Sequence, residues 1–155
     1  MTDTDTMEKA KITEFVSLRA GGQGYCVEIT SIREIRRWRT VTSLPNSDKS
    51  ILGVMNLRGS VIPIIDLAAR LGLPMTEVGP RSVVVVVAVG NRVIGLLVEA
   101  VSEILSIAAD EIQPNPTQGH DGNDGQVVGL VSVDDEMLKI LALETIVDRD
   151  AEEVA

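Results

Sequence analysis

The chain has 155 residues, of which 45% are apolar and 2% aromatic, and its formal net charge is −9. This length allows one good core or two small modules packed as a unit, and the apolar content excludes a mainly disordered protein. The negative charge disfavours nucleic acid as a partner, and no apolar run approaches the roughly 20 residues that a membrane helix needs, so we expect no membrane insertion.

The first half of the chain predicts short strands separated by glycine-rich turns. Residues 1–11 are polar, lack periodicity and predict a disordered tail. A short helical turn that leads into a strand is expected within residues 30–39, and Asp66 is expected to cap a short helix that ends at Gly72. The other expected strands are residues 12–20, residues 25–29 and both arms of a hairpin over residues 53–65 that turns near residues 58–60.

The second half repeats this pattern after a linker at residues 74–80. Residues 83–87 are all valine, without polar alternation, so this strand is expected to be covered on both faces. Residues 108–126 form a long polar loop, which is either functional or mobile. The expected strands are residues 82–89, 92–98, 101–107, 127–133 and 137–143, followed by an acidic tail over residues 144–155 in which a helix is allowed.

The two halves match each other at constant offsets. Residues 15–46 align with residues 84–115 at an offset of 69, and after a longer loop the offset becomes 76. Glycines, Pro-Asn pairs and Glu-Ile pairs match as well as valines, which chance alone does not explain. The repeat predicts a single domain over residues 12–147 with two similar modules and a seam between them. We place subdomain one at about residues 12–73 and subdomain two at about residues 81–143, and expect small β-barrels rather than βαβ units.

Few residues could support catalysis or metal binding. His120 is the only histidine and lies in a polar loop, with no second His or Cys at a ligand spacing, so we expect a solvated loop residue. The single cysteine, Cys26, is expected to be buried in a strand and is compatible with a reducing compartment. A barrel enzyme that uses Asp66 with His120 is the rival interpretation. We expect no enzyme and no metal or cofactor.

The two copies differ most at their later hairpins. Residues 56–60 supply the cation Arg58, whereas the matching residues 132–136 supply carboxylates. Arg58 suits a bidentate contact with a partner's carboxylate or carbonyl groups, and an exposed turn arginine is the alternative. Ile32 and Ile35 are apolar residues in a charged segment, which is typical of an interface anchor, although both could pack inward instead.

The hairpin segment also carries a resemblance. Residues 53–67 have the sequence GVMNLRGSVIPIIDL, which resembles the signature of the CheW family of chemotaxis coupling proteins. The similarity continues through residues 82–107 and 110–114 and covers about residues 14–147. The resemblance implies a mainly β fold of two packed five-stranded SH3-like barrels with short helices and a shared apolar interior.

The resemblance further implies a non-enzymatic adaptor that joins the cytoplasmic tip of methyl-accepting chemoreceptors to the regulatory domain of a CheA-type histidine kinase. The length leaves no room for the catalytic parts of the kinase, so a stand-alone adaptor is expected, cytoplasmic and recruited to membrane-associated receptor arrays. A pathway for surface motility or gene regulation in place of swimming chemotaxis stays open. So do the roles of the run Arg36, Arg37, Trp38 and Arg39 and of the loop at residues 117–126, either of which could tune partner choice.

Candidate binding residues also come from the resemblance. The kinase contact is implied for the segment after the second strand, and the receptor tip, a helical hairpin, is expected near the groove between the barrels. The implied kinase-binding residues are Ile29, Ile32, Glu34 and Ile35, and the implied receptor-binding residues are Asn56, Arg58, Val83 and Val84.

Overall fold

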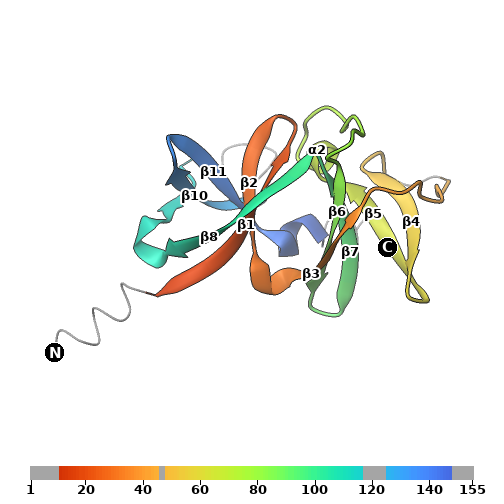
Figure 1. Ribbon diagram of the computed structural model, residues 1–155, viewed down its shortest axis with the longest axis horizontal. Helices are drawn as coiled ribbons and strands as arrows, with labels where there is room; N and C mark the ends of the chain where they lie inside the picture. Colours follow the sequence, from red (N-terminus) through yellow and green to blue (C-terminus); the bar gives the residue numbers. More distant parts are fainter. Residues whose placement is uncertain (1–10, 46–47, 117–124, 148–155) are drawn as a thin grey trace.

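The computed structural model describes residues 11–45, 48–116 and 125–147. Over these residues the chain is mainly β, with two sheets side by side and short helical segments between strands (Figure 1). The predicted fold class is confirmed. Residues 1–10 of the expected N-terminal tail, residues 117–124 of the expected loop and residues 148–155 of the acidic tail lie outside the described residues.

The strands and helices follow the predicted order, except that residues 108–126, expected to form a loop, include a 3-10 turn at Ala109–Glu111 and a short strand at Gln113–Pro114. Short 3-10 turns follow the strands at Gln23–Glu28 and Ala100–Ala108, and residues 143–147 are helical. The elements are β1 (Ile12–Ala20), β2 (Gln23–Glu28), η1 (Ile29–Ser31), β3 (Ile32–Arg37), β4 (Ile51–Leu57), β5 (Ser60–Asp66), α2 (Leu67–Arg70), β6 (Val83–Val89), β7 (Arg92–Val98), β8 (Ala100–Ala108), η2 (Ala109–Glu111), β9 (Gln113–Pro114), β10 (Val127–Val133) and β11 (Glu136–Leu141).

Each sheet takes strands from both halves of the chain. The first sheet has the order β8-β1-β2-β11-β10-β9 and the second has the order β3-β6-β7-β5-β4. The predicted subdomain ranges, residues 12–73 and 81–143, therefore do not bound the two sheets. The physical reason is the parallel pairing of β2 with β11 and of β7 with β5, which inserts the first hairpin of each copy into the sheet of the other.

The sequence repeat is also a repeat of strand pairing. Ile35 lies opposite Val85 where β3 pairs with β6, and Ile104 lies opposite Val16 where β8 pairs with β1. These two pairs are related by the offset of 69 residues. The first sheet gains one strand over the second because the two-residue β9 pairs with β10. The exchanged hairpins join both halves of the chain into one unit.

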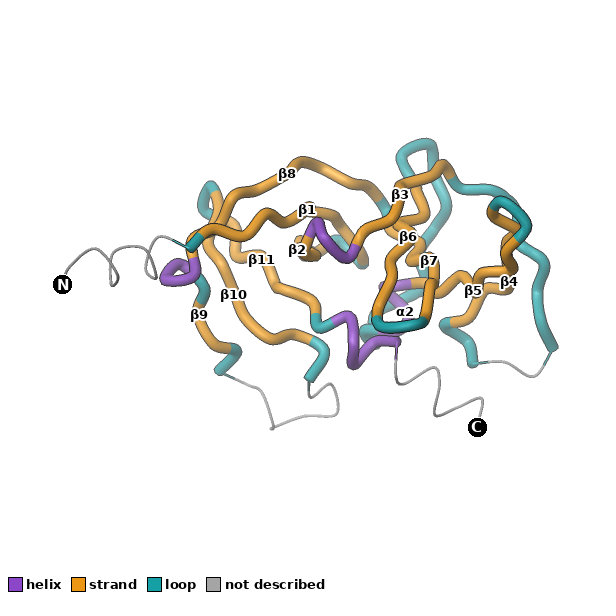
Figure 2. Tube along the Cα trace, turned by 90° about the horizontal axis from the view of Figure 1, so that it is seen from below, coloured by secondary structure: helices purple, strands orange, loops and turns teal. Residues whose placement is uncertain are grey.

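Apolar side chains pack in three clusters among the described residues, one inside each sheet and the largest between the sheets. Strand β6 contributes to two of them, because Val84 and Val86 face the interior of the second sheet while Val85 and Val87 face the cluster between the sheets. This coverage of both faces is what the run of valines predicted. Figure 2 shows the helical residues 143–147 after β11, between the two sheets, where Ile146 is fully buried.

Asp66 caps α2 as predicted. Its Oδ1 accepts a hydrogen bond from the Ala68 N–H at 3.1 Å, and the side chain also accepts from the Thr76 N–H and hydroxyl at 2.7 and 2.6 Å.

The last expected strand ends at Leu141 instead of residue 143, because residues 143–147 form the helix between the two sheets. This helix occupies the place that α2 has in the first copy.

Candidate functional site

An apolar groove of about 440 Å³ runs between the two sheets, bordered by β3 on one side and β8 on the other. Each of these strands lies at one edge of its sheet. The repeat-related residues Ile35 and Ile104 are 43% and 57% exposed, which is unusual for isoleucine. We call this surface the groove; its lining residues are Val16, Ile29, Ile32, Glu34, Ile35, Val101, Ser102, Glu103 and Ile104.

The implied kinase-binding residues Ile29, Ile32, Glu34 and Ile35 all line the groove. Ile32 is partly buried and packs against the cluster between the sheets, so the inward alternative holds for part of its side chain. Ile35 points out. The contribution of β8 was missed in the sequence, although the repeat already matched Val101 and Ile104 to Ile32 and Ile35 and could have found it.

A second hollow, of about 560 Å³, lies at the open end of the second sheet. We call it the mouth. Val61 is 67% exposed there and Val93 is 38% exposed. Glu34 lines the mouth as well as the groove, so β3 separates the two surfaces. The lining residues are Arg33, Glu34, Leu57, Arg58, Ser60, Val61, Ile62, Val86, Asn91 and Val93.

Arg58 and Glu34 form an ion pair at the edge of the mouth. Arg58 Nη1 lies 2.8 Å from Glu34 Oε2, and Arg36 Nη1 lies 3.2 Å from the other oxygen of Glu34. Arg58 sits in the β4–β5 turn with a φ of +52°, and Asn56 Oδ1 accepts a hydrogen bond from the Gly59 N–H at 3.0 Å. Asn56 thereby fixes the turn that presents Arg58.

The expectation that Val84 contacts a receptor needs correction. Its side chain is fully buried, with 0% exposure, inside the second sheet. Val83 is partly buried and packs against the cluster between the sheets. Both lie on β6, whose central residues are covered on two faces, so Val84 has no free side for a partner.

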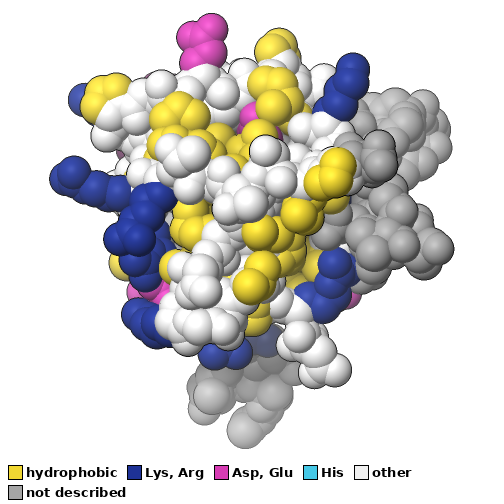
Figure 3. All heavy atoms as spheres, turned by 90° about the vertical axis from the view of Figure 1, so that its right-hand side faces the viewer, with side chains coloured by type: hydrophobic (Ala, Val, Ile, Leu, Met, Phe, Trp, Pro, Cys, Tyr) yellow, Lys and Arg dark blue, Asp and Glu magenta, His cyan; other side chains and the backbone are white. Residues whose placement is uncertain are grey.

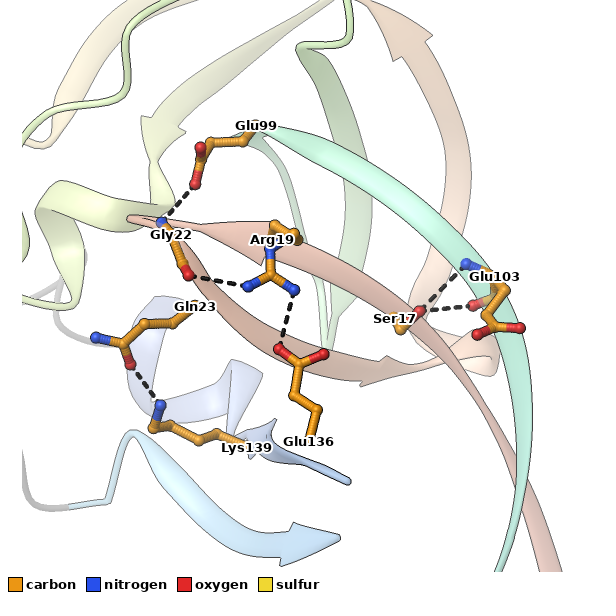
Figure 4. Close-up of polar contacts among 8 residues, drawn as sticks. All are labelled: Ser17, Arg19, Gly22, Gln23, Glu99, Glu103, Glu136 and Lys139. Carbon is orange, nitrogen blue, oxygen red and sulfur yellow. Dashed lines mark hydrogen bonds and ion pairs between the residues drawn. The ribbon is translucent and has the colours of Figure 1, made fainter. Parts of the chain in front are cut away.

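The first sheet has an equivalent mouth that is smaller, about 110 Å³. Arg19 crosses it and lies 2.9 Å from Glu136, and its other terminal nitrogen donates to the Gly22 carbonyl at 2.9 Å (Figure 4). Asp134 takes the place of Arg58 with a similar φ of +49°. The difference between the copies that the sequence predicted, a cation against carboxylates, is therefore present at matching positions.

The run of residues 36–39 lies at the end of β3. Trp38 packs against the interior of the second sheet, while Arg37 and Arg39 are exposed. Figure 3 views the end of the molecule formed by the second sheet and shows Lys and Arg side chains gathered along one side, next to apolar surface. A positive edge beside exposed apolar groups is typical of a protein-binding surface.

Of the residues considered for catalysis, the structure describes Asp66 and Cys26, and both are buried. His120 lies outside the described residues, and Asp66 is buried as a helix cap. Cys26 is fully buried, and burial raises the pKa of its thiol to about 12. Within the part of the chain that the structure describes, no three His, Cys, Asp or Glu side chains are grouped to hold a metal ion, and no helix is long and apolar enough to cross a membrane.

The comparisons with known proteins agree with one another. The family model described as CheW-like domain matches residues 14–151. Over 142 residues, which are 92% of both chains, this chain is 42% identical to the probable chemotaxis protein CheW of Rhizobium etli and 39% identical to the chemotaxis protein CheW of Rhizobium meliloti. The crystal structure of the scaffolding protein TtCheW from Thermoanaerobacter tengcongensis matches with a TM-score of 0.83 and 28% identity over 92% of this chain and 97% of that one.

Proposed function

Because this chain belongs to the CheW-like family of adaptors, we propose that it couples chemoreceptors to a CheA-type histidine kinase. It acts by binding and catalyses no reaction, in the cytoplasm at membrane-associated receptor arrays. The names of the relatives favour chemotaxis as the pathway. Two neighbouring surfaces with different chemistry support an adaptor, since each can hold one partner.

The groove is the surface we assign to the receptor tip. An amphipathic helix docks by placing apolar side chains into an apolar groove, and here Ile35 and Ile104 offer such contacts from opposite sides. Glu34 and Glu103 supply a charged rim. The family resemblance implied that Ile29, Ile32 and Ile35 bind the kinase. We assign them to the receptor instead, because they line the space between the sheets where the resemblance expects the helical hairpin.

The mouth is the surface we assign to the regulatory domain of the kinase. Val61 and Val93 form an exposed apolar centre, and the ion pair of Arg58 with Glu34 lies beside them. An apolar centre with charged residues around it is the composition that protein interfaces favour. Glu34 stays a kinase-binding residue in this proposal. The resemblance implied receptor binding for Arg58; we assign Arg58 to the kinase instead, because it pairs with Glu34 at the edge of the mouth.

The observation that carries the proposal is that Glu34 lines both the groove and the mouth, so the two surfaces lie on adjacent sides of β3. The test measures binding to two separate partners, the isolated regulatory domain of a CheA-type kinase and a soluble fragment with the receptor hairpin. Ile104→Asp should weaken receptor binding at least about tenfold and leave kinase affinity within about twofold, and Val61→Asp should do the reverse.

Thermal unfolding of each variant shows whether the fold is kept. Failure of the unmodified chain to bind either partner would end the adaptor proposal. If both substitutions instead weakened the same partner, the adaptor role would stand and the assignment of the two surfaces would be wrong.

A further inference from the structure

A further hollow, away from the groove and the mouth, lies where α2 meets the first sheet. It has a volume of about 350 Å³, in the lower part of the range of roughly 300–1,000 Å³ for small-molecule pockets. Its apolar lining includes Leu71 and Leu73, which follow α2, and Val127 and Leu130 of β10. We call it the α2 hollow. Residues from both halves of the chain form it, so an occupant would touch both.

Lys139 brings a charge into the α2 hollow. The side chain is partly buried, its Nζ donates a hydrogen bond to Gln23 Oε1, and it lies 5.1 Å from the centre of the Tyr25 ring. Figure 4 shows Lys139 and Gln23 pointing toward one another from β11 and β2. Tyr25 itself is 3% exposed. The cation is held in place by two neutral groups.

No carboxylate among the described residues pairs with Lys139. A partly buried ammonium group whose described partners are all neutral loses hydration that these partners do not fully replace, so the hollow favours an anion. Gln23 accepts from Lys139 through its oxygen, which leaves its amide nitrogen as a second donor.

The fold itself does not require this arrangement. At the equivalent positions of the second sheet, Lys139 corresponds to Pro63 and Tyr25 corresponds to Ile94, at the offsets of 76 and 69 residues. The second sheet forms the same parallel pairing without a cation there. The charged site is thus an addition to one copy and not part of the repeated framework.

We infer that the α2 hollow binds a small amphipathic carboxylate. The carboxylate lies against Lys139 Nζ and the Gln23 amide, and the apolar chain lies on Leu71, Leu73 and Leu130. Charge-assisted hydrogen bonds orient the head group, and the apolar wall recognises the chain. This inference does not depend on the adaptor role, because neither the groove nor the mouth contributes to the site.

The test is a titration of the full chain with octanoate, followed by amide shifts in two-dimensional NMR. Octanoate should give saturable shifts at residues 71–73 and 127–130. Acetate, which lacks the chain, and octanol, which lacks the charge, should each bind at least about tenfold more weakly. Lys139→Met should weaken octanoate binding about tenfold and leave octanol binding unchanged, whereas Lys139→Arg should retain octanoate.

Lys11→Met is the matched control, since Lys11 is exposed and outside the hollow. Thermal unfolding checks that each variant is folded, and the arginine variant keeps the test valid if the methionine variant is not. Octanoate shifts that map to the groove, or equal octanoate affinity for the unmodified chain and the folded Lys139→Met variant, would overturn the inference.

Discussion

Arg58 and Glu34 connect the β4–β5 turn to β3, with 2.8 Å between Arg58 Nη1 and Glu34 Oε2. The Arg58 side chain is 77% exposed and that of Glu34 is 23% exposed. An ion pair so open to water contributes only about 0–1 kcal/mol to folding. The pair orients two side chains at the edge of the mouth. We expect it to contribute mainly to the affinity for a partner, because a bound partner excludes water from the pair.

Arg58→Ala should therefore separate binding from stability. We expect the free energy of unfolding in urea to change by less than about 1 kcal/mol, while the affinity for the kinase regulatory domain falls about tenfold. Arg81→Ala is the control, because Arg81 is exposed and lines neither surface. Unchanged kinase affinity in the Arg58 variant would remove Arg58 from the proposed interface.

Substitutions on the two sides of the groove should have similar effects. Ile35→Asp and Ile104→Asp each place a carboxylate in the groove, and we expect receptor-fragment binding to fall at least about tenfold for each. Stability should change little, because both side chains are already half exposed. Ile12→Asp is the control, since Ile12 is 61% exposed outside the groove. Isothermal titration calorimetry measures the affinity of each variant for the receptor fragment. A loss of affinity in the Ile35 variant alone would contradict a two-sided groove.

Local structure was predictable because each strand and turn is specified by neighbouring residues. The positive φ of the turn glycines Gly21 and Gly90 and the buried cap at Asp66 leave direct marks in the sequence. The exchange of hairpins between sheets leaves no such mark. Two repeated copies can form the same strand pairs within each half or between halves, and only contacts between distant residues, such as Ile140 beside Cys26, decide between them.

The candidate site was predictable in part for the same reason. Ile35 and Arg58 were singled out from their residue types within short segments, and Glu34 was singled out by the family resemblance. The ion pair between Glu34 and Arg58 was not, because it depends on a turn with positive φ that folds 24 residues away from β3. Val84 was assigned to an interface from its place in a motif, although the run of valines around it already predicted burial.

Val84→Ala should act on the core and not on a partner. Removing two carbons from a fully buried valine should lower the free energy of unfolding by about 2–3 kcal/mol, measured in urea. Receptor affinity of the folded variant should stay within about twofold. Val83→Ala, at a partly buried neighbour, should cost clearly less. A loss of receptor binding without a loss of stability would restore Val84 as a binding residue.

Asp66→Ala should also destabilise the fold. The substitution leaves the buried N–H group of Ala68 and the partly buried N–H group of Thr76 without their acceptor, for which we expect a loss of about 2–4 kcal/mol. Asp66→Asn keeps one acceptor oxygen and should lose roughly half as much. Chemical denaturation measures both values. A stable Asp66→Ala variant would argue against the capping role and revive Asp66 as a functional carboxylate.

The Cys26 thiol should report folding through its reactivity and its titration. Burial raises its pKa from the ordinary value of 9.0 to about 12, so the folded state holds the protonated thiol. The raised pKa affects the free energy of unfolding. The stabilisation by the protonated Cys26 thiol is complete below pH 9 and is lost as the pH rises from 9.0 toward about 12, because only the unfolded state then releases the proton. From pH 8 to pH 10 the free energy of unfolding of the unmodified chain should fall by about 1 kcal/mol more than that of Cys26→Ala.

At pH 8 a thiol reagent should modify Cys26 in the folded chain at least about a hundredfold more slowly than in the chain unfolded in urea. Equal rates in the two states would mean that the β2 position of Cys26 is open to solvent, against its full burial in the first sheet.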